Sequence, residues 1–255
     1  MEYIEKFGKA DLHIHSTFSD GSNSIEEILD YTETKTDLNI IAICDHDTVE
    51  GAYLAKKIAH EKNLRIKVVI GEEISTKEGH VVALFIEKAI PPGLSLPETL
   101  DQIEYQGGLA IAPHPMFHTR VRGKDEAVMD GIGFVNLIKY KEKFTGVEIV
   151  NATPWMGRKN LNAHFINSSL VFKSETGGSD AHILDAIGKG YTAFEGKDIK
   201  SLKYALEVGQ TIAIGVRWKT LSLLKYAFFF IPKGIRIFFF TLLHGFTKKR
   251  PQIDL

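Results

Sequence analysis

The sequence predicts an α/β domain in which a parallel sheet or barrel is covered by helices on its outside. Short apolar runs alternate with amphipathic helical stretches along most of the chain, which is the order that parallel strands and their crossover helices produce. The chain has 255 residues, 44% of them hydrophobic, which suits one large domain or two small ones with a substantial core. Histidine and carboxylate residues follow several of the apolar runs.

Seven apolar runs are expected to form buried strands because they are short and rich in aliphatic residues. They cover 10–14, 40–44, 68–70, 81–86, 109–112, 147–150 and 191–194. The first helix begins at the capping box Ser24-Ile-Glu-Glu27 and continues with apolar residues at helical spacing. Further helices are expected over 49–61, 96–105, 124–138, 160–168 and 199–208. Gly131 and Gly133 interrupt the one at 124–138.

Residues 217–255 differ from the rest and are predicted to form a separate hydrophobic and basic tail after a domain of residues 1–216. Pro232 and Gly234 divide this segment, and neither half reaches the roughly 20 apolar residues that span a bilayer. One interpretation is a peripheral membrane anchor over 226–250, with Lys248-Lys249-Arg250 near acidic headgroups. The other is a pair of helices that pack on the domain or form a homodimer.

The overall charge and the cysteine content limit the classes of function. The formal net charge is −1, so no global field attracts nucleic acid, and no stable nucleic-acid partner is expected. Cys44 is the one cysteine, it lies in an apolar run, and no intrachain disulfide can form. The first residues lack the apolar stretch of a signal peptide, so a cytoplasmic protein is expected.

His13 and His15 are the most informative residues because neighbours at i and i+2 of a strand point to one face. Comparable residues lie at the ends of the other expected strands, where parallel α/β barrels gather their active sites. They are Asp45-His46-Asp47, Glu72-Glu73, His80, His114, Glu148 with Asn151, and Asp180 with His182. Taken singly, several have ordinary explanations, such as a helix cap at Asp45-His46-Asp47 or a rigid turn at Pro113-His114-Pro115. Together they predict one shared pocket.

Histidine mixed with carboxylates favours Zn²⁺, Mn²⁺ or Fe²⁺. Six histidines and three or four carboxylates exceed the needs of one ion, so two or three ions bridged by a carboxylate are expected. Adjacent ions lower the pKa of a bridging water and hold a phosphoryl group from two sides.

Seven short motifs occur in order along the chain: His13-Ile-His15-Ser, Ser19-Asp20-Gly21, Asp45-His46-Asp47-Thr48, Gly71-Glu-Glu73-Ile-Ser75, Gly79-His80-Val-Val-Ala, Pro113-His114-Pro115 and Gly178-Ser-Asp180-Ala-His182. As a set they resemble the PHP family, the polymerase and histidinol phosphatase domain, over roughly residues 8–195. The resemblance implies a distorted seven-stranded (β/α) TIM-like barrel that holds up to three divalent metals, here followed by the hydrophobic helical tail. Many members of the family hydrolyse phosphate esters.

The resemblance also implies a set of metal ligands. One ion would take His13, His15, Glu73 and Asp180; a second, bridged by Glu73, would take His80 and His114; a third would take Asp20, His46 and His182. The family pattern selects Glu73 over Glu72. Many phosphatases of the family have a further histidine near Glu148–Asn151, and this sequence has none there. In this respect it resembles the CehA-like branch of the family, and the number of bound ions stays open.

The expected reaction is hydrolysis of a phosphomonoester or small phosphodiester by a metal-bridging hydroxide. Asp45 is expected to orient a histidine ligand, and His46 or His182 to assist the leaving group. Substrate contacts are expected from Arg120, Arg122, Asn151 and Arg158, with solvent-exposed charge as the ordinary alternative for the arginines. The alternatives to phosphoester hydrolysis are a carboxyl or carbamate ester hydrolase and a membrane-associated metal-binding module without hydrolysis. His60 is expected to be an exposed helix residue, and His164 a packing or surface residue and not a ligand.

Overall fold

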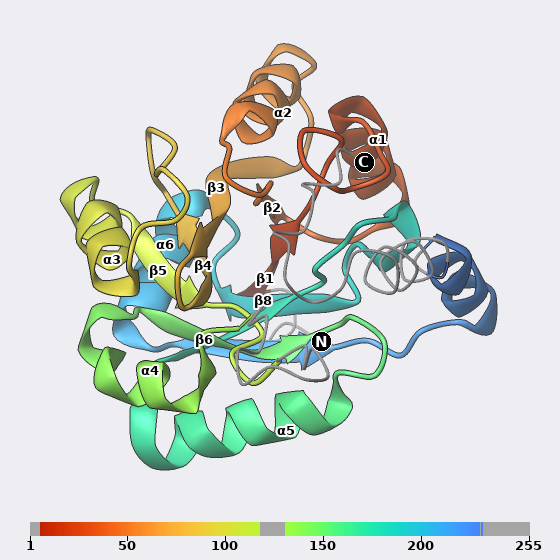
Figure 1. Ribbon diagram of the computed structural model, residues 1–255. Coiled ribbons are helices and arrows are strands. Elements are labelled where there is room, and N and C mark those ends of the chain that lie inside the picture. Colours follow the sequence, from red (N-terminus) through yellow and green to blue (C-terminus); the bar gives the residue numbers. More distant parts are fainter. Residues whose placement is uncertain (1–5, 118–130, 230, 232–255) are drawn as a thin grey trace, which may run out of the picture.

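The computed structural model describes residues 6–117, 131–229 and 231 of the chain (Figure 1). Its strands are β1 (Phe7–Ile14), β2 (Ile40–Ile43), β3 (Lys67–Thr76), β4 (Gly79–Leu84), β5 (Leu109–Ala112), β6 (Gly146–Asn151), β7 (Ser174–Gly178), β8 (Gly190–Glu195) and β9 (Thr211–Gly215). Its helices are α1 (Ile25–Lys35), α2 (Glu50–Glu61), α3 (Leu96–Tyr105), α4 (Gly133–Lys139), α5 (Gly157–Ile166) and α6 (Ile199–Val208).

The strands form one sheet in the order β7-β6-β5-β4-β3-β2-β1-β8-β9. Neighbours are parallel within β1-β2-β3 and within β5-β6-β7. The β3-β4-β5 connections and the β1-β8-β9 edge are antiparallel. The expected parallel barrel is therefore mixed, and the described residues contain nine strands instead of the seven that the resemblance implies.

The sheet closes on itself where the end of β7 meets β1. Ile14 and Ala181 form a parallel bridge, in which the His15 amide donates to the Ala181 carbonyl over 2.9 Å. Buried Asp11 fastens the same seam, since its carboxylate accepts from the Ser179 amide at 2.9 Å and from the Gly188 amide at 2.8 Å. This nearly closed, barrel-shaped sheet confirms the predicted fold class.

Replacing Asp11 by alanine is expected to lower the free energy of unfolding by about 2–4 kcal/mol, because the buried Ser179 amide and the part-buried Gly188 amide lose their acceptor. Chemical denaturation of the variant and of Asp30→Ala, an exposed aspartate of α1, provides the comparison. Equal stability of the two variants would contradict a fastening role for Asp11.

Strands β7 and β9 were not predicted from the sequence. Residues Asn167–Val171 form a π-helical turn, and the strand follows at Ser174–Gly178. Its glycines permit the closure of the barrel. A Cβ on Gly177 would lie 2.5 Å from the Tyr191 carbonyl oxygen, and one on Gly178 would lie 2.6 Å from the His13 Cβ. Side chains at these two positions would separate the strands.

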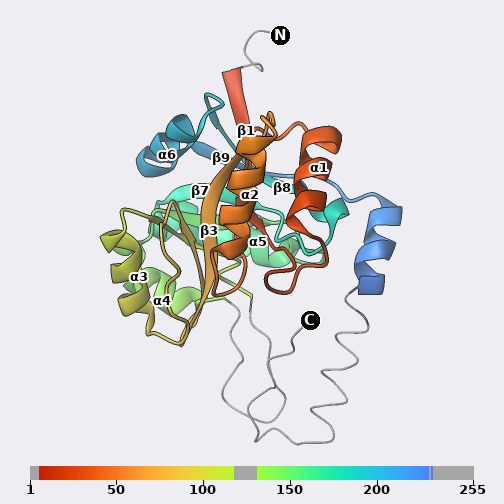
Figure 2. The same cartoon turned by 90° about the horizontal axis from the view of Figure 1, so that it is seen from above.

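The helices cover the outside of the sheet, as predicted, with α1 and α2 side by side (Figure 2). The capping box at Ser24 and Glu27 is present, and α1 buries Ile25, Ile28 and Leu29. The predictions for α2, α3 and α6 agree with the structure to within one residue, and α5 begins three residues earlier than predicted. Of the predicted helix 124–138, the described part is α4, and residues 124–130 lie outside the described residues.

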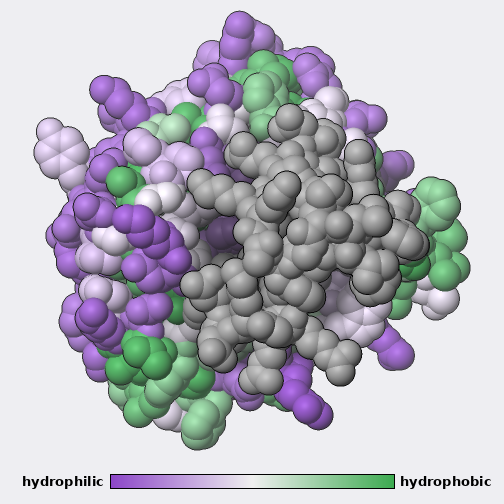
Figure 3. Space-filling model, viewed as in Figure 1, coloured by the Kyte–Doolittle hydropathy of each residue, from purple (hydrophilic) through white to green (hydrophobic). Residues whose placement is uncertain are grey.

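The first part of the predicted tail packs on the barrel. The Trp218 indole donates to the Ala152 carbonyl at 2.7 Å, and Ser222 donates to Asp185 at 2.8 Å. Residues 220–229 are helical, and Leu221, Leu224 and Phe228 are exposed on this helix, the green group at the right edge of Figure 3. Among the described residues, no helix has the length and apolar character needed to cross a bilayer. Residues 232–255, with His244 and Lys248-Lys249-Arg250, lie outside the described residues.

Candidate metal centre

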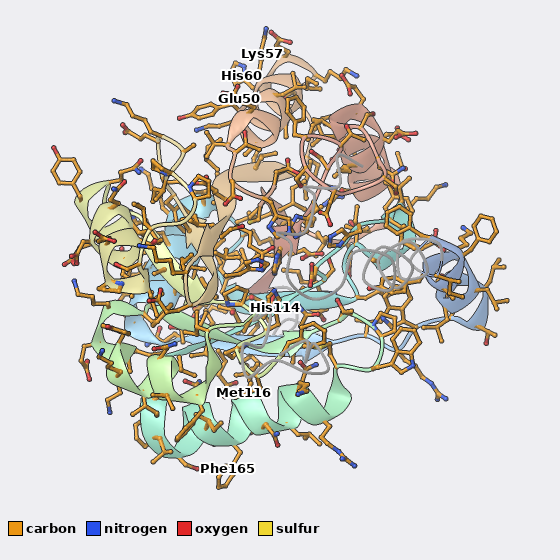
Figure 4. The ribbon with its side chains drawn as sticks, viewed as in Figure 1. Glu50, Lys57, His60, His114, Met116 and Phe165 are labelled. Carbon is orange, nitrogen blue, oxygen red and sulfur yellow. The ribbon has the colours of Figure 1, made fainter. Side chains whose placement is uncertain are left out.

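All nine predicted metal ligands meet at one end of the barrel. They are His13, His15, Asp20, His46, Glu73, His80, His114, Asp180 and His182. They form four overlapping groups, and within each group the ligand atoms lie within 4.8 Å of one another. Figure 4 shows His114 near the middle of the molecule, whereas His60 lies on the outer part of α2. His60 is exposed, as predicted, and His164 is also exposed, which agrees with the surface alternative.

Glu73 lies at the centre because each of its carboxylate oxygens faces a different set of histidines. Its Oε2 lies 3.1 Å from the His13 Nε2, 3.2 Å from the His15 Nε2 and 3.5 Å from the His46 Nε2. Its Oε1 lies 3.1 Å from the His80 Nδ1 and 3.0 Å from the His114 Nε2. A carboxylate in this position has the geometry to bridge two cations.

Asp20 and His182 form a second focus next to the first. The His182 Nε2 lies 2.9 Å from an Asp20 oxygen, and the His182 Nδ1 lies 3.0 Å from the Asp180 carbonyl. Because a carbonyl can only accept, Nδ1 carries the proton, and Nε2 is the nitrogen left for a cation. His15 and His46 complete this group.

The donor set fits divalent cations better than it fits a network of hydrogen bonds. Within the described residues, the buried His15 Nε2 and His80 Nδ1 have no hydrogen-bond partner, although each lies close to a Glu73 oxygen. Buried polar atoms are normally satisfied, and a shared cation would satisfy both the nitrogens and the carboxylate. The chemistry of the donors favours Zn²⁺, Mn²⁺ or Fe²⁺.

Two of the candidate ligands have a strained backbone. His114 and Asp180 have φ values of 28° and 51°, in the left-handed region that residues with side chains rarely adopt. Such strain persists only where surrounding contacts enforce it, and it clusters at functional sites. Here it turns two side chains that follow β5 and β7 into the same pocket.

The electrostatics of the site are dominated by burial and by the proximity of opposite charges. Burial disfavours the charged form of Glu73, yet the surrounding histidines hold its pKa well below the ordinary value. Burial lowers the pKa of His15, but the Asp180 and Glu73 carboxylates outweigh it and raise that pKa from 6.5 to about 10. Burial lowers the pKa of His46 to about 4. His46 is therefore neutral at pH 7 with a lone pair available, whereas His15 must release a proton before it binds a cation.

Cation binding is therefore expected to release protons, and its stabilising effect to grow with pH. In the metal-free protein, the raised pKa of His15 contributes stability that is complete below pH 6.5 and is lost as the pH rises toward about 10. The bound cation replaces that proton. The difference in melting temperature between Mn²⁺-saturated and chelator-treated protein should increase from pH 6.5 to pH 9. A constant difference would contradict proton release by the ligands.

Several predicted roles are corrected by the structure. Asp45 does not orient a histidine: its carboxylate accepts from the Ser16 amide and hydroxyl and from the Ser19 hydroxyl, each at 2.7 Å, and so holds the loop after β1. Asp47 does not cap α2, because its carboxylate accepts from the Ser75 amide at 2.7 Å.

The predicted substrate contacts also change. Asn151 is buried and donates to Glu148 at 2.9 Å and to Asp180 at 3.1 Å, so it positions ligand side chains and does not face substrate. Arg158 is exposed and does not line the cavity, whereas its neighbour Lys159 does. Arg120 and Arg122 lie outside the described residues.

Glu148 is the main site residue that the sequence-based ligand set lacks. Its Oε1 accepts from the His13 Nδ1 at 3.1 Å, and its Oε2 accepts from the His114 amide at 2.8 Å. It therefore fixes which nitrogen of His13 faces Glu73. A charged residue inside an apolar strand, close to Asn151, was the feature of the sequence that could have identified Glu148 as a site residue. Glu72 points away from the centre and accepts from the Ile90 amide at 2.9 Å, which agrees with the choice of Glu73 as the ligand.

A cavity of about 480 Å³ opens onto the ligands. Its polar lining includes Asp20, His46, Glu73, His80, His114, Asp180, His182 and Lys159. Its apolar lining comes from Phe117, Pro154, Trp155, Met156 and Tyr226. Tyr226 belongs to the segment that was predicted to be a separate tail.

Comparison with known families agrees with this geometry. The family model described as PHP domain matches residues 11–189, and the model described as PHP-associated matches residues 173–211. The barrel and its ligand cluster define a metal-dependent hydrolase that acts on ester bonds. The chain belongs to the PHP family. The CehA-like branch stays a prediction.

Two similar proteins come from Methanocaldococcus jannaschii. The uncharacterized protein MJ1587 is 44% identical over 117 residues, which are 42% of this chain and 67% of that protein. The uncharacterized protein MJ0417 is 30% identical over 195 residues, 75% of this chain and 73% of that protein. Among solved structures, a two-domain protein from Bacteroides vulgatus containing a predicted PHP-like metal-dependent phosphoesterase matches with a TM-score of 0.60 at 20% identity. That match covers 82% of this chain and 65% of the other chain, and it shows the fold.

Proposed function

We propose that this protein hydrolyses phosphate esters, either phosphomonoesters or small phosphodiesters, with two or three divalent cations. The observation that carries the proposal is the position of Glu73, whose two oxygens face separate sets of histidines. Paired cations, when bound, would activate a water molecule and neutralise charge on the phosphoryl oxygens. Mn²⁺, Zn²⁺ and Fe²⁺ are the proposed candidates.

The residues around the cluster divide into holding and proton-handling groups. Glu73, His13, His15 and Asp180 would hold the central cation, and Glu148 and Asn151 keep this set oriented. His46 and His182 line the cavity. We propose that His182, where it is not occupied as a ligand, assists the departure of the leaving group as a general acid, whereas His46, whose pKa is lowered to about 4, lacks the extra proton that this role requires.

The test begins with the purified full chain and a measurement of its bound metals. Hydrolysis of p-nitrophenyl phosphate and bis(p-nitrophenyl) phosphate is then measured with Mn²⁺, Zn²⁺ and Fe²⁺, with p-nitrophenyl acetate as the third substrate. The proposal expects bound metal and hydrolysis of at least one phosphate ester. Faster turnover of the acetate would favour the carboxyl or carbamate ester alternative. A folded protein that binds no metal and cleaves neither phosphate ester would overturn the proposal.

Lys159 is proposed to attract the substrate phosphate in place of the predicted Arg158. Lys159→Ala is expected to raise KM for a phosphomonoester about fivefold with little change in kcat, since a partly exposed charge steers and binds more than it catalyses. Arg158→Ala is the matched control and should leave both constants unchanged. The reverse result would restore the original assignment of Arg158.

The remaining expectations about partners concern segments that are mostly outside the described residues. We propose a small phosphorylated substrate, no stable nucleic-acid partner, and peripheral membrane contact or homodimerisation through residues 226–250. Sedimentation with and without anionic vesicles tests membrane contact and homodimerisation. A monomer that stays in the supernatant would exclude both membrane contact and homodimerisation.

A further inference from the structure

The cavity has an apolar side that metal binding and phosphate hydrolysis do not explain. Trp155 and Tyr226, here called the aromatic wall, line it together with the cation ligands. The two rings come from segments about seventy residues apart in the sequence, and their centroids lie 6.5 Å apart in a T-shaped arrangement. A wall of this kind must either support the fold or contact a ligand.

Trp155 has the features of a ligand-binding residue. It is 84% exposed, although burying an indole ring normally contributes strongly to stability. Its φ of 72° lies in the left-handed region, which is unfavourable for a bulky residue. The same loop is tied to the metal centre, because the Thr153 amide donates to Asn151 at 2.9 Å and the Thr153 hydroxyl donates to Asp180 at 3.4 Å. The exposed ring is thus held in place by the residues that orient the ligands.

Tyr226 is held rigidly behind this ring. Only 4% of Tyr226 is exposed, and its ring also packs against Trp218 at a centroid distance of 5.3 Å. Trp218 is fastened to the Ala152 carbonyl, and Lys225 pairs with Asp185 at 2.9 Å. The segment 218–226 is therefore a part of the site, and Tyr226 supports the face that Trp155 exposes.

We propose that the aromatic wall binds an aromatic group on the leaving-group side of the phosphoester. This inference rests on the proposed function, and it narrows the substrate class to aryl or nucleoside phosphates. The anionic phosphoryl end is attracted to the cations, and an aromatic ring can cover the exposed indole face and remove it from water. Stacking of this kind is tolerant of ring chemistry, because every aromatic ring presents a π-face.

The test compares three phosphomonoesters on the same metal-loaded protein: p-nitrophenyl phosphate, adenosine 5′-monophosphate and glycerol 2-phosphate. The main variant is Trp155→Gly, because glycine adopts the left-handed region without strain and the fold should be retained. It is expected to raise KM about tenfold for an aromatic ester and to change KM for glycerol 2-phosphate less than about twofold. Phe165→Ala removes a comparably exposed ring from α5 and should change none of these values.

Tyr226 is tested in the same assay with two substitutions. Tyr226→Phe keeps the ring but loses the hydroxyl that hydrogen-bonds Thr153, so it should keep the preference for aromatic esters even if KM shifts for all three esters alike, whereas Tyr226→Ala should reproduce the effect of Trp155→Gly. Phe228→Ala is the control on the same helix, since Phe228 is 83% exposed and does not line the cavity. Calorimetry with phenylphosphonate and ethylphosphonate on the Mn²⁺-loaded protein gives a binding readout that needs no turnover.

The outcomes separate this inference from the proposed function. If Trp155→Gly raises KM for p-nitrophenyl phosphate alone, the ligand is a single aromatic ring. If it also raises KM for adenosine 5′-monophosphate, the ligand is a nucleoside. If Trp155→Gly raised KM equally for all three esters, the proposal that the aromatic wall binds an aromatic group would be overturned, and the proposed hydrolase function would stand. The same conclusion would follow if the protein bound phenylphosphonate and ethylphosphonate equally well both with and without the substitution. Absence of hydrolysis in the unchanged protein, with the phosphonate preference still present, would instead overturn the proposed function.

Discussion

Glu73→Gln is expected to lose most of the bound metal and to reduce hydrolysis by more than about 100-fold. Loss of a residue that only hydrogen-bonds to a metal ligand costs about 10- to 100-fold, and loss of a bridging ligand itself should cost more. The substitution removes the negative charge shared by five histidines and replaces one of the two oxygens with an NH₂ group that repels a cation. Elemental analysis after dialysis, followed by an assay with added Mn²⁺, measures both effects.

Glu72→Gln is the matched control for Glu73→Gln. Glu72 is an equally buried neighbour in β3, but its carboxylate accepts from the Ile90 amide, which a glutamine oxygen can also do. Burial raises the pKa of Glu72 to about 7, so a neutral replacement is tolerated. The control should retain its metal. Normal metal content in Glu73→Gln would refute the bridging position of Glu73.

Glu148→Gln is expected to weaken metal binding by about 10- to 100-fold and to preserve activity at saturating metal concentration. Its two oxygens accept from three donors, which are the His13 ring, the His114 amide and the Asn151 amide group. A glutamine offers one oxygen, so its NH₂ group must face at least one donor. The buried mismatch should also lower the free energy of unfolding by about 1–3 kcal/mol.

Titration of the metal-free variant with Mn²⁺ measures the affinity, and activity at high Mn²⁺ separates positioning from chemistry. Glu142→Gln serves as the control, since Glu142 is exposed and pairs with Lys173 at 3.3 Å far from the ligands. Activity that stays low at saturating metal would mean that Glu148 takes part in the reaction itself.

Much of the site was predictable because its chemistry is local in the sequence. The His-x-His pair needs only the alternation of a strand to converge, and most of the other candidate ligands follow apolar runs that are recognisable one at a time. The resemblance to the PHP family supplied Asp20 and the choice of Glu73 over Glu72. All nine predicted ligands accordingly lie in the four groups. Where a role depended on a distant partner, prediction failed: Asp45 lies beside His46 in the sequence but binds Ser16 and Ser19 in the structure.

Strand β7 shows why part of the fold could not be predicted from patterns. Its sequence, Ser-Glu-Thr-Gly-Gly, has no apolar run, because its role is to allow close approach of the backbone at the seam. The need for glycine at Gly177 arises from Tyr191, which follows it in the chain and meets it only in the closed barrel. Propensity describes neighbours in sequence and contains no information about such contacts.

The sequence by itself determined the fold class and the cluster of candidate ligands, since these depend on strand alternation and on the types of donor groups, and its PHP motifs indicated the hydrolytic metal chemistry. Only the tertiary structure decided that Glu148 orients His13 and that Tyr226, from the predicted tail, lines the cavity beside Trp155. His13 and Glu148 are 135 positions apart in the sequence, and Trp155 and Tyr226 are about seventy apart. Such distances are closed by the packing of the whole barrel, which no local pattern encodes.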